Sequence, residues 1–373
     1  MPVPRRRRVT ISTVARRAGR SVSTVSAALN GAPGVAESTR QEIRDIAREL
    51  GYEADPKARL LRRASTGLIG VSFVAGQAFQ VELVDGLYAA CERLGRDIAL
   101  SAVTGGRDET EGVRGLLRER CESLVLVDSA VDDALLREAA AVMPVVLLCH
   151  GTEVPGVDVV RSQDDVGVRV LVEHLLSTGR RRLAHVDGGS ASAAPVRSRV
   201  FTEVLAGHGL PAPVVAGGDD EESGTRAASA LAAQGSLPQA LVCFNDRCAL
   251  GAVLELRRRG LRVPEDVAVT GYDGIPFSGL SALDLTTVRQ DAPVIADVAV
   301  RRVVAGMESM TDPADPADPV SRPSGGGALE EAPAQGLPDG LPPGVVVDRL
   351  PGGGAVYSVR PHLLVRGSSA PSS

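Results

Sequence analysis

Four hydroxyl side chains near the N-terminus have the type and spacing to contact nucleic acid: Ser21, Ser23, Thr24 and Ser26. They lie at the start of residues 22–29, where apolar residues recur at helical spacing. A short polar helix start of this kind can enter the major groove of DNA, where the base pairs are distinguishable. The alternative is an ordinary small helical bundle with an exposed serine face.

The formal charge of the chain is distributed unevenly. Residues 1–63 hold 14 Lys and Arg against 6 Asp and Glu, whereas the whole chain of 373 residues has a net charge of −5. A small basic segment on an acidic chain favours a polyanionic partner for that segment alone. The alternative is a solvated basic tail, because Arg5–Arg8 supply half of the local excess.

Three short helices are predicted around the hydroxyl cluster. Residues 10–19 read as a helix that Thr10 can cap and Gly19 ends. A second helix follows over residues 22–29, and a third over residues 37–50. Two helices of about eight residues joined by a short turn with glycine predict a helix-turn-helix.

A fourth, basic helix is predicted over residues 55–65. Asp55 can cap it, and Pro56 suits its first turn. Because the segment is short and its charges are of one sign, we do not expect it to persist as a free helix in water.

The remainder of the chain alternates strands with helices. This alternation predicts parallel sheets covered on both faces, and more than six such units suggest two doubly wound halves. Ligands of such folds bind at the carboxyl ends of the strands. The predicted strands are 68–73, 98–103, 124–127, 145–148, 183–186, 240–244 and 267–271, with a helix over 81–94.

Several classes of protein are not expected. Five dispersed cysteines without a CxxC pair favour reduced thiols in a cytoplasm, and no ligand set for a metal is apparent. No apolar run of 18 residues occurs, and no apolar segment follows the basic N-terminus, so we expect neither a membrane span nor a secretion signal. The motifs GxGxxG after the first strand, GxxxxGK[ST], GxSxG and HExxH are missing. We therefore expect no enzyme and no cofactor.

Two sets of residues match the sequence pattern of a known protein family. The first, in the N-terminal part, is Val9-Thr10-Ile11, Val14-Ala15, Ala18-Gly19, Thr24-Val25-Ser26, Leu29-Asn30 and Leu50-Gly51-Tyr52. The second is Asn245-Asp246, Val263-Pro264-Glu265-Asp266-Val267, Gly271-Tyr272-Asp273 and Leu285-Thr286-Thr287-Val288. Both resemble the lactose repressor (LacI/GalR) family of bacterial transcriptional regulators.

The resemblance implies a fold and a domain order. The fold is α/β, with a helix-turn-helix DNA-binding domain and a two-lobed effector domain similar to periplasmic sugar-binding proteins. The expected parts are the DNA-binding domain 1–54, a hinge helix 55–65, an effector and dimerisation domain 66–366, and a Pro- and Gly-rich disordered insertion 311–344. Lobe 1 is expected at about 66–160 and 290–310, and lobe 2 at about 162–288 and 345–366. The crossings between the lobes are expected near Arg161, near Val288 and within 311–344.

The resemblance also implies DNA contacts. Leu61 matches the family's intercalating leucine, which wedges into a base step and kinks the DNA; the alternative is a core leucine of a linker helix. Val22 and Ser23 match base-reading positions but carry no bidentate donor. The expected DNA-binding residues are Thr10, Arg20, Ser21, Val22, Ser23, Thr24, Ser26, Asn30, Arg59 and Leu61.

Effector contacts are expected at the strand ends. Arg197 matches the family's ligand-binding arginine, and an arginine fork facing Asp273 could bind a diol or a carboxylate. Alternatively, Asp273 caps a loop and Arg197 pairs on the surface. The expected effector-binding residues are Phe79, Cys149, His150, Arg197, Asn245, Asp273 and Gln290.

These observations together predict a regulator of the repressor type that binds pseudo-palindromic double-stranded operator DNA as a homodimer. A small molecule, a sugar or related metabolite, is expected to control it, although the 2% aromatic content is low for sugar stacking. A dimer is expected because no leucine-heptad tail follows. The main alternative, a secreted solute-binding protein, does not explain the basic N-terminal helices.

Overall fold

The computed structural model describes residues 9–29, 34–52, 66–235, 237–311 and 341–370, and the chain divides into two compact units, Met1–Thr66 and Gly67–Ser373. Asn30, the expected hinge helix with Arg59 and Leu61, and residues 312–340 of the expected insertion lie outside the described residues. Among the helices of the described residues, none is long and apolar enough to cross a membrane.

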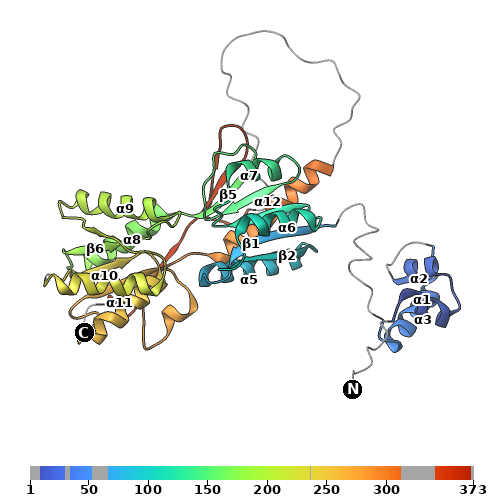
Figure 1. Ribbon diagram of the computed structural model, residues 1–373, viewed down its shortest axis with the longest axis horizontal. Helices are drawn as coiled ribbons and strands as arrows, with labels where there is room; N and C mark the ends of the chain where they lie inside the picture. Colours follow the sequence, from blue (N-terminus) through green and yellow to red (C-terminus); the bar gives the residue numbers. More distant parts are fainter. Residues whose placement is uncertain (1–8, 30–33, 53–65, 236, 312–340, 371–373) are drawn as a thin grey trace, which may run out of the picture. The chain divides into compact units, whose positions relative to one another are not determined.

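The first unit contains α1 (Ile11–Ala18), α2 (Val22–Leu29) and α3 (Glu37–Glu49), which confirms the three predicted helices (Figure 1). Gly19 ends α1 in the left-handed conformation, with φ 61°, where glycine carries no steric cost. Val14 of α1, Val25 of α2 and Ile43 of α3 are completely buried and belong to one apolar core. Each helix is too short to be stable alone, so this small shared core holds the unit together.

The second unit contains two sheets. The first has the strand order β11-β12-β5-β4-β3-β1-β2 and is parallel except for the β11–β12 pair. Its strands are β1 (Leu68–Val74), β2 (Asp97–Val103), β3 (Ser123–Val127), β4 (Val145–Leu148), β5 (Asp158–Ser162), β11 (Val345–Arg349) and β12 (Ala355–Val359). Its helices are α5 (Ala78–Arg93), α6 (Glu109–Arg118), α7 (Asp133–Ala140) and α12 (Ala292–Thr311).

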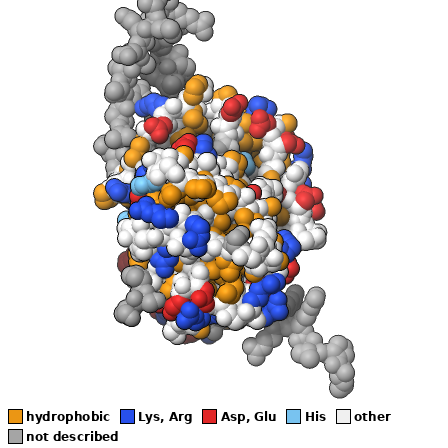
Figure 2. Space-filling view, turned by 90° about the vertical axis from the view of Figure 1, so that its left-hand side faces the viewer, with side chains coloured by type: hydrophobic (Ala, Val, Ile, Leu, Met, Phe, Trp, Pro, Cys, Tyr) orange, Lys and Arg blue, Asp and Glu red, His pale blue; other side chains and the backbone are white. Residues whose placement is uncertain are grey.

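The second sheet has the order β13-β10-β9-β8-β6-β7, with only β13 antiparallel to its neighbour. Its strands are β6 (Leu183–Val186), β7 (Val214–Val215), β8 (Ala240–Cys243), β9 (Ala268–Asp273), β10 (Thr286–Arg289) and β13 (His362–Leu364). Its helices are α8 (Asp164–Ser177), α9 (Ala194–Gly207), α10 (Glu221–Ala233), α11 (Asp246–Arg258) and the 3₁₀ turn η1 (Pro276–Gly279). Figure 2 views this lobe from its outer end, where charged side chains of both signs border exposed apolar ones.

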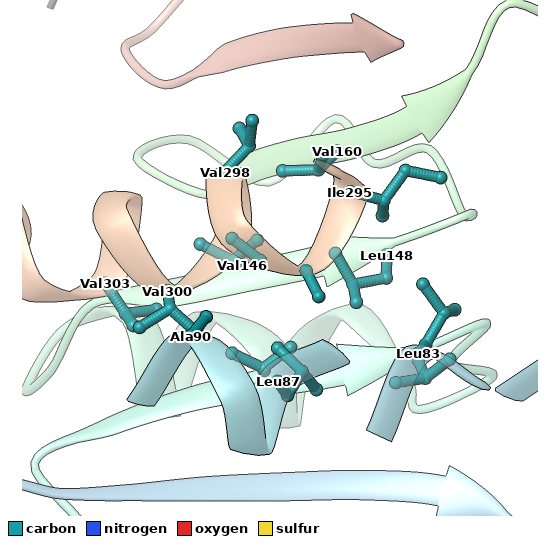
Figure 3. Close-up of a cluster of buried hydrophobic side chains, with 14 of the residues drawn as sticks. Leu83, Leu87, Ala90, Val146, Leu148, Val160, Ile295, Val298, Val300 and Val303 are labelled. Carbon is teal, nitrogen blue, oxygen red and sulfur yellow. The ribbon is translucent and has the colours of Figure 1, made fainter. Parts of the chain in front are cut away.

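Both sheets have an apolar core on each face, as the alternating pattern predicts. In the first lobe, α5 and α12 cover one face, and α6 and α7 the other. In the second lobe, α8 and α9 cover one face, and α10 and α11 the other. Figure 3 shows the first of these cores, in which Leu87 of α5, Val300 of α12 and Val146 of β4 meet.

The chain passes between the lobes after β5, after β10 and between β12 and β13. The first two passages lie next to Arg161 and Val288, where they were expected. The third corrects the sequence analysis, which placed residues 345–366 in lobe 2 and this crossing within 311–344. β12 pairs inside the first sheet between β5 and β11 and is buried along its whole length, so the crossing falls at residues 360–361.

Candidate functional site

A cavity of about 70 Å³ lies between the two lobes of the second unit. It is at the carboxyl ends of the strands, with Asp128 directly after β3, Cys149 directly after β4, and Asp273 at the end of β9. This is where doubly wound sheets bind ligands. Six of the seven expected effector residues line it: Phe79, Cys149, Arg197, Asn245, Asp273 and Gln290.

His150 is the expected residue that does not line the cavity. Its side chain is 37% exposed, and its Nδ1 lies 3.8 Å from Asp128 Oδ1. The nearby carboxylate of Asp128 raises the pKa of His150 above its usual value, against the effect of burial. Cys149 lines the cavity directly after β4, whereas His150, one residue further along the chain, does not.

Arg197 projects from α9 and is only 5% exposed. Its Nε donates to Asp164 Oδ1 at 2.8 Å, and one terminal nitrogen donates to the carbonyl oxygen of Phe244 at 2.8 Å. The rings of Tyr272 and Phe244 flank the guanidinium, with their centroids 3.6 and 4.7 Å from its central carbon. Burial disfavours the charge, but Asp164 outweighs it together with Tyr272 and Asp273, so the pKa of Arg197 is above its usual range.

The partner of Arg197 differs from the sequence expectation. Asp273 Oδ1 lies 3.9 Å from the guanidinium, whereas Asp164 accepts a direct hydrogen bond. The fork therefore faces Asp164 more closely than Asp273. The alternative of a surface pair is wrong, because the side chain of Arg197 is buried.

Asp273 is bound by a neutral donor. Gln290 Nε2 donates to its Oδ1 at 2.7 Å, and Gln290 N donates to its carbonyl oxygen at 3.1 Å. Burial raises the pKa of the Asp273 carboxyl to about 7, although Arg197 and Gln290 act in the opposite direction. A carboxyl group that titrates near neutrality is typical of a functional site.

Backbone strain is concentrated in the cavity. Five non-glycine residues of the described chain have positive φ, and three of them line the cavity: Asp128 at 47°, Cys149 at 62° and Asp273 at 103°. Each such residue costs about 1–3 kcal/mol and persists only where the surrounding structure holds it. Clustering of strain at one place supports a binding role for that place.

Asn245 lines the cavity, but both ends of its amide are already bound. Its Oδ1 accepts from the Cys248 amide at 2.8 Å and so caps α11. Its Nδ2 donates to the Asp219 carbonyl at 2.9 Å. Asn245 therefore positions the chain around Phe244 and Asp219, a role that its residue type did not reveal.

Several cavity residues were missed by the sequence analysis. Asp128, Arg161, Asp164 and Asp219 all line the cavity. Asp128 and Asp164 follow strands β3 and β5 almost directly. The rule that ligands bind at strand ends could have found these two. Asp219 lies in a loop that precedes α10, and no sequence signal marked it.

Hydrogen bonds cross directly from one lobe to the other around the cavity. Ser192 of the second lobe donates to Asp128 Oδ1 at 2.5 Å and contacts the Cys149 carbonyl at 3.1 Å. Gln77 of the first lobe donates to Asp219 Oδ2 at 2.6 Å. The lobes are therefore closed on each other, and separating them breaks these bonds.

The first unit presents a separate candidate surface at the start of α2. Arg20, Ser21, Val22 and Ser23 are exposed, and Thr24 and Ser26 are half-buried. Ser21 Oγ accepts from the Thr24 amide at 3.1 Å, as the predicted cap requires. Thr10, also exposed, precedes α1. This places all the expected DNA-binding residues of the described chain at the starts of α1 and α2.

Comparison with known proteins agrees with both units. Residues 10–55 match the model of bacterial regulatory proteins of the lacI family, and residues 172–325 match a periplasmic binding protein-like domain. The HTH-type transcriptional regulator GntR of Pseudomonas aeruginosa is 31% identical over 313 residues, which cover 80% of this chain and 89% of that protein. The HTH-type transcriptional repressor PurR of Vibrio cholerae is 30% identical over 290 residues, covering 75% and 86%.

Solved structures share the fold. A LacI transcriptional regulator from a Rhodococcus species is 32% identical with a TM-score of 0.68, and the match covers 82% of this chain and 98% of that one. The lac repressor dimer bound to operator and the anti-inducer ONPF has a TM-score of 0.75 at 23% identity, covering 98% and 100%. The helix-turn-helix, the two-lobed α/β unit and these relatives lead to one conclusion: the chain belongs to the lacI family of bacterial regulatory proteins and is a DNA-binding transcriptional regulator with an effector domain.

Proposed function

We propose that this regulator represses transcription by binding a pseudo-palindromic operator as a homodimer, and that a small molecule in the cavity between the lobes controls it. The observation that carries the proposal is the closed cavity itself. It gathers buried charges, a carboxyl group that titrates near neutrality and three strained residues at the strand ends of a chain that also has a helix-turn-helix.

Each of the two units has its own role, DNA binding in the first and effector binding in the second. The first unit, with Arg20, Ser23 and their neighbours on α2, contacts the major groove, and the hinge segment 55–65 with Leu61 contacts the minor groove. The support for the hinge is its sequence alone. The second unit binds the effector through Phe79, Arg197 and Asp273 among others, and joins the two copies. Such a protein acts in the bacterial cytoplasm, on the nucleoid.

Control follows from linkage. If the effector prefers one arrangement of the lobes and DNA prefers one spacing of the two helix-turn-helix units, each ligand changes the affinity for the other. The bonds from Ser192 to Asp128 and from Gln77 to Asp219 join the two lobes in the closed arrangement. They are the contacts through which effector binding would be transmitted.

The test is a footprint and a gel-shift titration on the DNA upstream of the chain's own gene. We expect protection of two half-sites related by two-fold symmetry, with affinity that changes when effector is added. The direction of that change identifies an inducer or a co-repressor. Protection of one asymmetric half-site at undiminished affinity would contradict the dimeric operator complex.

A further inference from the structure

The charges that line the cavity are predominantly negative. Four aspartates face two arginines: Asp128, Asp164, Asp219 and Asp273 against Arg161 and Arg197. Arg197 already uses two of its five donors within the wall, because Asp164 and the Phe244 carbonyl take hydrogen bonds from it. Asp164 and Arg197 therefore neutralise each other within the wall.

The other three aspartates accept their hydrogen bonds from neutral donors, while Asp273 also lies 3.9 Å from the Arg197 guanidinium and Asp128 lies 3.8 Å from His150 Nδ1. Ser192 donates to Asp128, Gln77 donates to Asp219, and Gln290 donates to Asp273, and each bond uses one carboxylate oxygen. Within the described chain, no hydrogen bond reaches the second oxygen of any of the three. Arg247, the cation beside this edge, is held by both oxygens of Glu221 at 2.9 and 2.6 Å.

Arg161 is the other arginine that lines the cavity. It is exposed at the end of β5 and, within the described residues, makes no side-chain hydrogen bond. Solvent screens its charge, so it offsets the three carboxylates only in part. The pKa of the Cys149 thiol reflects these surroundings. Burial raises this pKa, and the charges of Asp128, Asp164 and Asp273 raise it further, whereas Arg197 lowers it.

Two uncharged groups of the cavity also favour a bound ligand. Ser162 is 3% exposed, and its buried hydroxyl oxygen has no hydrogen-bond partner among the residues that the structure describes. Such an orphan hydroxyl is costly unless a bound molecule satisfies it. The ring of Phe79 lines the same cavity, and the face of an aromatic ring attracts cations.

We propose, on the basis of the effector role assigned above, that the effector is a positively charged amine whose ammonium group donates hydrogen bonds to these free carboxylate oxygens. An ammonium carries three donors and no acceptor, which matches the surplus of acceptors. A cavity of about 70 Å³ holds roughly five water molecules. A short amine fits the closed form, and a larger one must separate the lobes.

The test compares matched molecules that differ in charge. One series is putrescine, 1,4-butanediol and succinate, which share a four-carbon chain; the other is glucosamine, glucose and gluconate. Binding of each to the full-length protein is measured by calorimetry. We expect the amine to bind most tightly in at least one series. Tighter binding of the neutral or anionic member in both series, or no saturable binding of either amine, overturns the proposal.

Substitutions in the cavity should change amine affinity in both directions, which a general loss of stability cannot do. Asp219→Asn and Asp273→Asn keep the shape of the side chain and should weaken amine binding about tenfold or more, because a partner of a buried charge is lost. Arg161→Gln should strengthen it a few-fold. Glu138→Gln, which removes an exposed carboxylate from α7, is the control and should change nothing. Weakening by Arg161→Gln, or no effect of either aspartate substitution, contradicts the amine site.

The operator titration separates this proposal from the proposed function. If an amine binds the cavity but leaves operator affinity unchanged, the charge preference stands and the effector role fails. If glucose, gluconate, 1,4-butanediol or succinate changes operator affinity while the amines do not, the effector role stands and the charge preference fails.

Discussion

The start of α2 and the cavity between the lobes carry function in opposite ways. In the first unit the candidate DNA contacts, such as Arg20 and Ser23, are exposed, whereas Val14, Val25 and Ile43 form the core. In the cavity, Arg197 and Asp273 are candidate ligand contacts and are themselves buried. Function and stability therefore rest on separate residues in the first unit and on the same residues in the cavity.

Size explains the difference. Three helices of at most 13 residues share one small core, so a charged group placed inside it would displace a large share of the apolar contacts. The second unit has four separate apolar cores. This surplus of burial can hold strained residues and buried charges at the edge where the lobes meet.

The largest expected effect comes from Arg197→Ala. The substitution leaves Asp164 and Asp273 buried without their cation, which should lower the free energy of unfolding by about 3–5 kcal/mol and abolish the response to effector. Urea unfolding measures the first effect, and an operator titration with effector measures the second.

Arg199→Ala is the matched control, because Arg199 lies on the same helix but is exposed and pairs with the exposed Glu203 at 2.7 Å. Its loss should cost less than about 1 kcal/mol. If Arg197→Ala were as mild as Arg199→Ala, the shared role of cavity residues in binding and stability would be wrong.

Ile43→Ala tests the first unit in the same way. Ile43 is completely buried in the small core, so its truncation should cost about 2–4 kcal/mol and remove operator binding. Calorimetry should show the unfolding of the second unit at an unchanged temperature. Ile46→Ala, at a half-buried position of the same helix, should cost less. A parallel drop in both units would show that they do not unfold separately.

The pH dependence of stability tests the cavity without disturbing its shape. Because burial holds the pKa of Asp273 at about 7, above its ordinary value of 3.8, its protonated form stabilises the folded protein at low pH. That contribution is lost as pH rises through 7, by about 2 kcal/mol between pH 5 and 7. Arg197 from α9, Gln290, Asp164 from α8 and Glu82 from α5 are the groups that face it.

The measurement compares the wild type with Asp273→Asn between pH 5 and 8. The stability of the wild type relative to the variant should fall as pH rises. His185, whose pKa burial lowers to about 4, loses stability in the opposite direction, but it is present in both proteins and cancels in the difference. A difference that does not vary with pH would mean that Asp273 is ionised throughout.

The sequence predicted those features that depend on local pattern. Residues 22–29 form the predicted helix, and the strands 145–148 and 183–186 have the predicted bounds, because apolar periodicity and caps are local signals. The pairing of residues 355–359 with β5 was not predictable, since an apolar run does not state which sheet will bury it. The partner of Arg197 was assigned wrongly for the same reason, because the choice between Asp164 and Asp273 depends on how α8 and α9 pack.

The same distinction between local pattern and tertiary packing applies to the cavity residues. Arg197, Asp273 and Gln290 were predicted from residue type and family likeness, and the structure places all three around the cavity. Asn245 was predicted as a ligand contact, but its amide is used to cap α11. Residue type alone does not reveal whether a polar group is already satisfied within the protein.

The smallest expected effect on stability is that of Arg20→Ala. Arg20 lies exposed in the turn between α1 and α2, and within the described residues it makes one hydrogen bond, from its amide to the Ala15 carbonyl at 3.1 Å. Its loss should leave the melting temperature unchanged within about 1 °C, while operator affinity falls roughly five- to tenfold. If the side chain contacts a phosphate, the slope of log affinity against log salt should also become shallower by about one unit.

Arg48→Ala is the control, since Arg48 is also exposed but lies at the far end of α3 and pairs with Asp45 at 2.9 Å. Equal losses of affinity from both substitutions would mean that general positive charge, and not the start of α2, directs the first unit to DNA.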